Sequence, residues 1–85
     1  MSHLDNVIDI RRPVEFSIDG RTYRTSTRRQ TAANLLLLAG LDPAHHDLGE
    51  LRPYRPRPVR HSGTDIVEIR KGTRFVSLRD RVEVV

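Results

Sequence analysis

Apolar and polar residues alternate through residues 14–18, and this period of two predicts a strand whose three apolar residues face a core. Asp19-Gly20 follows, a dipeptide typical of the two-residue turn of a β-hairpin. Residues 21–26 are rich in β-branched and aromatic side chains and predict the return strand. A polar connection at residues 27–30 then leads into the next element.

A short helix is predicted over residues 31–40, which are mainly alanine and leucine. Thr31 suits the N-cap, and Gly40 suits the left-handed residue that ends a helix. Leu35 and Leu38, three positions apart, are expected to share its core face. A helix of about two to three turns is marginal alone in water. Core packing is therefore favoured over the alternative of a partner-binding helix.

The chain after the helix predicts short strands separated by a proline-rich loop. Residues 47–52 resemble a strand with Leu51 as its core residue. Residues 53–58 hold three prolines, which exclude a central strand and predict a stiff loop; a proline ligand for an aromatic groove is the alternative. Brief strand pairing is expected at Val59-Arg60, and residues 65–69 are apolar but short.

The last predicted strand is, like the first, strongly apolar. Lys71-Gly72 predicts a turn, and residues 73–78 predict a strand anchored in the core by Phe75. The first and last strands are expected side by side and parallel in the centre of a four- to five-stranded mixed sheet, with the helix across it. The predicted fold is α+β with a β-grasp topology.

The expected domain organisation has three parts. Residues 1–12 are expected to be a flexible arm, with an edge strand at residues 7–10 as the alternative. Residues 13–79 form the domain, and residues 80–85 form a tail. A chain of 85 residues predicts one domain with one small core.

Composition excludes several classes of site. The chain has no cysteine, hence no disulfide, thiolate nucleophile or thiolate metal site. Its longest apolar run, at residues 35–39, is too short to cross a bilayer. Asp5 and Asp9 interrupt any signal-peptide pattern. A cytoplasmic location without a membrane partner is expected.

Charge invites a nucleic-acid interpretation. The net charge is +4, and all but one of the 15 cationic residues are arginine. The arginines are spread among 11 acids, and the aromatic residues do not form a paired stacking signature. The sequence therefore disfavours nucleic-acid binding.

No catalytic set emerges from the spacing of reactive residues. His45-His46 and Asp47 are neighbours on a predicted loop, and adjacent side chains do not aim at one metal ion. No nucleophile has a base at a meaningful spacing, and there is no glycine-rich phosphate loop. We expect no enzyme activity, no cofactor and no metal.

Four blocks of sequence carry a family resemblance. They are Phe16-Ser-Ile-Asp-Gly-Arg-Thr-Tyr23, Leu36-Leu-Leu-Ala-Gly-Leu-Asp-Pro43, Asp47-Leu-Gly-Glu-Leu-Arg-Pro53 and Arg74-Phe-Val-Ser-Leu78. In this order and at these spacings, the set resembles the repeat unit of the bacterial multiubiquitin proteins, which are ubiquitin-like β-grasp domains. The resemblance implies a protein modifier of a bacterial conjugation system, or its precursor. The implied partners are activating-enzyme-like and conjugating-enzyme-like proteins and a JAB-type peptidase.

Two features depart from that family. Its name implies tandem repeats, whereas this sequence holds one unit, either a single-domain member or one repeat of a longer protein. Ubiquitin-type modifiers end in Gly-Gly, whereas this sequence ends in Val84-Val85. Three explanations stay open: the partner enzymes accept another terminus, a peptidase trims the tail, or the tail is not conjugated. Sulfur carriers of the same fold are disfavoured, because they also need a terminal glycine.

The resemblance assigns roles to particular residues. The implied conjugation or processing tail comprises Arg79, Asp80, Arg81, Val82, Glu83, Val84 and Val85. Lys71, the one lysine in the sequence, is the implied chain-linkage site, with a solvated turn lysine as the alternative. A partner surface on the outward face of the sheet is expected to include Glu50, Arg52, Arg74 and Val76. The alternative function is an unconjugated protein-interaction module.

Overall fold

The computed structural model describes residues 12–79; the predicted tail from residue 80 onward, and all of the predicted arm except Arg12, lie outside this range. The elements are β1 (Val14–Ile18), β2 (Arg21–Thr25), β3 (Arg29–Thr31), α2 (Ala32–Leu38), β4 (His46–Leu51), β5 (Val59–His61), β6 (Ile66–Glu68) and β7 (Thr73–Arg79).

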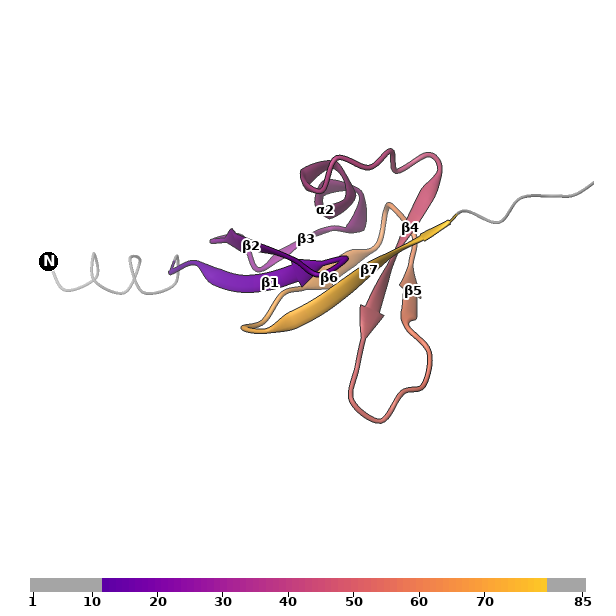
Figure 1. Ribbon diagram of the computed structural model, residues 1–85. Helices are drawn as coiled ribbons and strands as arrows, with labels where there is room; N and C mark the ends of the chain where they lie inside the picture. The colour runs from indigo at the N-terminus through magenta and orange to yellow at the C-terminus, as the bar shows by residue number, and fades with distance from the viewer. Residues whose placement is uncertain (1–11, 80–85) are drawn as a thin grey trace, which may run out of the picture.

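The main sheet is five-stranded and mixed, with the order β2-β1-β7-β4-β5 (Figure 1). β1 and β7 pair in parallel, and every other pairing in this sheet is antiparallel. The predicted central pairing of the first and last strands is therefore confirmed, as is the α+β class. Within residues 12–79 we find no helix with the length and hydrophobicity required to span a bilayer.

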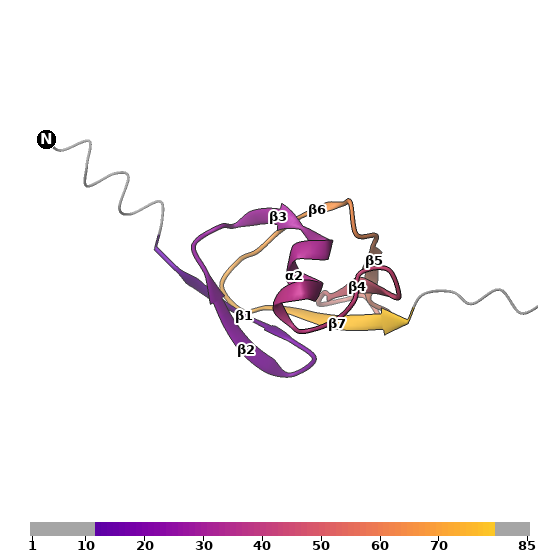
Figure 2. The ribbon, with the colours of Figure 1, turned by 90° about the horizontal axis from the view of Figure 1, so that it is seen from above.

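A second, two-stranded sheet joins β3 to β6, and the sequence pattern does not predict it. The pattern instead predicts a polar connection and the start of the helix at residues 29–31. Strands of three residues are too short for a period of two to be recognised. Figure 2 shows this pair along one side of α2, with β1 and β7 on the other side.

The helix buries a stripe formed by Ala32, Leu35 and Leu36. Leu38 is 50% exposed, so its predicted core position is wrong. The spacing i, i+3, i+4 defines one face of a helix, and Ala32 sets which of the four consecutive leucines join it. The stripe packs into one core with the following residues: Val14, Phe16, Ile18, Leu48, Val67, Ile69 and Phe75.

Both ends of α2 are capped. The Thr31 hydroxyl accepts from the Asn34 amide at 3.2 Å, as predicted. The Ala32 and Ala33 amides donate to carbonyls in the β5–β6 loop at 2.9 and 3.0 Å. At the other end Gly40 has φ +80°, and the Gly40 and Leu41 amides donate back to the last turn in the pattern of a Schellman motif. These bonds supply partners for the terminal amides and carbonyls that a two-turn helix cannot satisfy internally.

Strand β4 faces the core through Leu48, which is fully buried, whereas the predicted core residue Leu51 is only partly buried. Because side chains alternate along a strand, Leu48 and Leu51 point to opposite faces, and only one of them can face the helix.

On the face away from α2, β4 is crowded at Gly49. A Cβ atom there would lie 2.9 Å from the Cβ of Pro58. It would also lie 3.0 Å from side-chain atoms of both Leu78 and Val76. Glycine is therefore required here by space.

Gly49→Ala is expected to destabilise the protein by about 1–3 kcal/mol, because the new methyl group overpacks this contact. Gly63→Ala is the matched control, since its Cβ would sit at an ordinary 3.6 Å from the Cβ of Ala33. Urea denaturation of both variants measures the difference. Equal stability of Gly49→Ala and the parent protein would contradict the crowding.

Candidate functional site

The predicted surface residues divide between the two faces of the main sheet. Arg74 and Val76 alternate with the buried Phe75, so they lie on the face away from α2. Glu50 lies opposite Phe75 in the antiparallel register and therefore shares the helix-side face. Arg52, just beyond the end of β4, hydrogen-bonds to Glu50. The expectation that all four residues lie on the outward face is wrong for Glu50.

An open cleft of about 1100 Å³ lies between the end of β4 and the β6–β7 connection. Glu50, Arg52, Arg74 and Lys71 line this cleft, whereas Val76 does not. The charged lining residues are Glu50, Arg52, His61, Glu68, Arg70, Lys71 and Arg74. The tertiary structure thus brings the single lysine together with three of the four predicted surface residues.

Glu50 is the centre of a small polar cluster in the cleft. Its Oε1 accepts from Arg52 Nη2 at 3.1 Å and from His61 Nε2 at 3.0 Å, and its side chain is only 17% exposed. Burial acts to raise the pKa of Glu50, but the hydrogen bonds and charges of Arg52 and His61 outweigh it, so the pKa lies below its ordinary value. The same hydrogen bond raises the pKa of Arg52. Sequence reasoning missed His61, which reaches Glu50 through strand pairing.

The two acids in the cleft have cationic partners, whereas two of its cations do not. Glu50 binds Arg52, and Glu68 lies 3.6 Å from Arg70. Within residues 12–79, Lys71 and Arg74 form no ion pair. The cleft therefore presents uncompensated positive charge.

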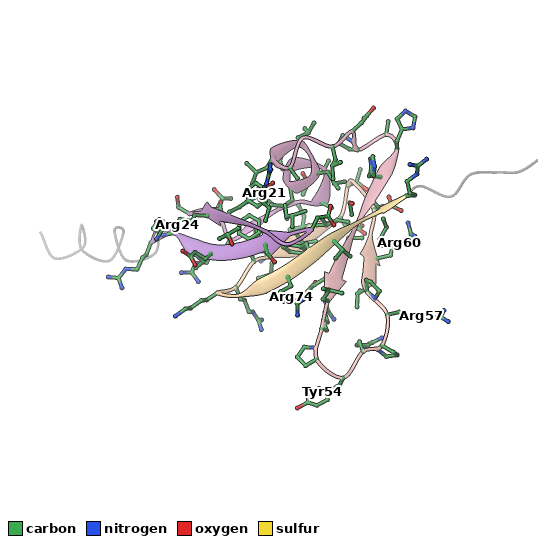
Figure 3. All side chains as sticks on the ribbon, viewed as in Figure 1. Arg21, Arg24, Tyr54, Arg57, Arg60 and Arg74 are labelled. Atoms are coloured by element: carbon green, nitrogen blue, oxygen red, sulfur yellow. The ribbon has the colours of Figure 1, made fainter. Side chains whose placement is uncertain are left out.

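The loop between β4 and β5 projects away from the body of the protein, with Tyr54 at its tip (Figure 3). Tyr54 is fully exposed and has φ +66°, a left-handed conformation that is unfavourable for a residue with a Cβ. Arg55 N–H donates to the Arg52 carbonyl at 3.3 Å and closes the turn. The predicted stiff loop is confirmed as a loop, and we call residues 52–58 the arginine loop.

The last strand is held at its exit by the β1–β2 turn. Asp19 Oδ1 accepts from the Ser77 amide at 2.8 Å, and Oδ2 accepts from the Ser77 hydroxyl at 2.7 Å. The Asp19 amide donates to the Phe75 carbonyl at 3.0 Å. Sequence reasoning finds no role for Ser77, because a partner 58 positions away leaves no local signal. Arg79, the first residue of the predicted tail, is exposed at the end of β7; the other tail residues lie outside the described range.

His45, in the loop before β4, and His46, the first residue of β4, both interact with Asp42. His45 Nε2 lies 3.8 Å from Asp42 Oδ2, and His46 Nδ1 lies 3.1 Å from the Asp42 carbonyl. Among residues 12–79, no three His, Cys, Asp or Glu side chains gather where they could hold a metal ion.

Comparison with known proteins finds no matching family model, curated protein or solved structure, and so adds no support to the resemblance seen in the sequence. Function must therefore be inferred from the geometry and chemistry of this chain.

Asp19→Gly is expected to lower stability by about 1–2 kcal/mol, because it removes both bonds to Ser77 while glycine still fits the turn at φ +52°. Amide hydrogen exchange at Ser77 should accelerate. Ser77→Ala, which removes only the hydroxyl bond, is the control and should have a smaller effect. Unchanged exchange at Ser77 in Asp19→Gly would show that the turn does not hold β7.

Glu50→Gln should make stability less dependent on pH in the acid range. A carboxyl with a lowered folded-state pKa stabilises the protein above its unfolded pKa, near 4.5, and loses this contribution as the pH falls through the folded value. The gap in unfolding free energy between parent and variant should therefore shrink below pH 4.5. Denaturation at a series of pH values measures it; a gap that stays constant would refute the assignment.

Proposed function

We propose that this protein is a ubiquitin-like modifier, or the precursor of one, in a bacterial ubiquitination-like conjugation system. In this proposal the fold is a β-grasp, and partner enzymes activate and conjugate the protein through the tail that begins at Arg79. The protein catalyses nothing itself. Activating-enzyme-like and conjugating-enzyme-like proteins and a JAB-type peptidase are the proposed partners.

The observation that carries this proposal is the arrangement around β7. A parallel β1–β7 pair in the middle of a mixed sheet, crossed by one short helix, is the arrangement that the β-grasp hypothesis requires. β7 is the last strand within residues 12–79, and it is bonded to β1, to β4 and to the Asp19 side chain. A tail that follows such a strand would leave a rigid body at a defined point, which suits an enzyme that must take up the tail while it binds the folded domain.

The cleft and the outward face supply a surface for partner enzymes. Arg74 and Val76 lie on the outward face, and Lys71 lies at the turn that precedes β7. Lys71 is exposed and forms no ion pair within residues 12–79, so its amine is sterically open to isopeptide formation. Such a surface is charged rather than apolar, and it favours acidic partner surfaces.

The test is to recover the epitope-tagged protein from its native cells and to measure its intact mass and those of its adducts. We expect a trimmed tail, an enzyme-linked thioester or an isopeptide on a target lysine. Lys71→Arg is the matched variant, because it keeps the charge and should abolish chains while leaving single adducts. Absence of processing, thioester and adduct would refute the modifier proposal.

An unconjugated interaction module is the second candidate, and the uncompensated charge of the cleft favours it, since docking needs no tail. Removal of residues 80–85 separates the two functions. A docking module keeps its partner in a pull-down after this deletion, whereas a modifier loses all adducts.

A further inference from the structure

Tyr54 has no structural role that accounts for its position. Its side chain is fully exposed, and the backbone conformation at φ +66° costs free energy that no contact of the side chain offsets. Strain kept at an exposed position points to a function for the side chain. Of the two tyrosines in the sequence, Tyr23 instead stacks on Phe16, with ring centroids 5.8 Å apart.

Arginines flank Tyr54 on both sides in the sequence. The arginine loop carries Arg52, Arg55 and Arg57, and it contains no acidic residue. Three prolines restrict its backbone, so an exposed ring and its flanking guanidinium groups are presented with little conformational entropy left to lose. Figure 3 shows Tyr54 and Arg57 on this projecting loop.

The tertiary structure adds the cations of the cleft to those of the loop. Arg74 lies opposite Leu51 in the β4–β7 register, directly before the arginine loop begins. Lys71 lines the same cleft as Arg52. The sequence places these groups about twenty positions apart, which is why the arginines look scattered there.

We propose that the arginine loop and the adjoining cleft bind single-stranded nucleic acid. An unpaired base stacks on the ring of Tyr54, and the flanking phosphates contact Arg55 and Arg57. The strand continues towards Lys71 and Arg74 in the cleft. This binding shares the cleft with the partner enzymes of the proposed modifier function, but it does not depend on the tail.

The exposed ring decides between a nucleic acid and an acidic peptide. Both ligands satisfy the cations, but only a nucleic acid offers planar bases that stack on a tyrosine whatever the sequence. A duplex keeps its bases stacked inside, so a single ring on a narrow loop requires an unpaired base. With one aromatic residue the site discriminates little between bases, and its affinity depends steeply on salt.

The first experiment measures the binding of the full chain to a fluorescein-labelled oligothymidylate of about eight nucleotides by anisotropy, over a range of NaCl concentrations. Tyr54→Ala should weaken binding by roughly fivefold or more, the loss expected for one stacked base. Arg55→Ala with Arg57→Ala should make the negative slope of log K against log salt shallower by about 1.4. Arg21→Ala with Arg24→Ala, on the opposite edge strand β2, is the charge-matched control and should change the slope little.

The second experiment uses the emission of Tyr54 itself. The sequence has no tryptophan and two tyrosines, so Tyr23→Phe leaves Tyr54 as the sole emitter and keeps the stack on Phe16. Its fluorescence should be quenched by the unlabelled oligonucleotide. Poly-glutamate at the same charge concentration should leave it unquenched.

Tyr54→Gly is the control for folding, because glycine relieves the positive φ at this position. This variant should have a melting temperature no lower than that of the parent protein, and it should lose binding as Tyr54→Ala does. Oligonucleotide binding that is unaffected by Tyr54→Ala overturns the proposal. So does poly-glutamate that binds as tightly as the oligonucleotide without quenching Tyr54, a result that would indicate a site for acidic peptides.

Discussion

Burial of Leu35 and Leu36 in one core with side chains of the paired strands β1 and β7 and of β4 is the interaction on which the rest of the structure depends. A seven-residue helix does not persist in water, and a sheet with Phe16 and Phe75 on one face cannot leave that face uncovered. Each element therefore needs the other. The small β3–β6 sheet completes the arrangement, because the loop before β6 supplies carbonyls for the first amides of the helix.

This packing leaves the two regions that we propose to be functional at opposite ends of β7. Arg74, near the start of the strand, borders the cleft and the arginine loop, whereas Arg79 at its end begins the proposed tail. Five residue steps along β7 separate Arg74 from Arg79 by about 17 Å. A partner on the arginine loop would therefore leave the tail accessible, so chemistry at the tail and binding at the loop are separable by mutation.

Elements with strong local signals were predictable. The alternation in β1, the Asp19-Gly20 turn and the caps of α2 at Thr31 and Gly40 are all present in the structure. The short strands β3 and β6 were not predicted, because three residues carry no measurable period. The burial of Leu36 in place of Leu38 was not predicted either, since a run of four leucines does not by itself define which face of the helix is buried.

The sequence by itself determined the order of elements, the hairpin turn and the helix caps, because these depend on neighbours within about four positions. The partners of charged groups were decided only in the tertiary structure. Asp19 meets Ser77, Glu50 meets His61, and Lys71 joins Arg52 in one cleft. Strand pairing brings these residues together, and pairing between distant segments is set by the packing of the whole core rather than by any local pattern.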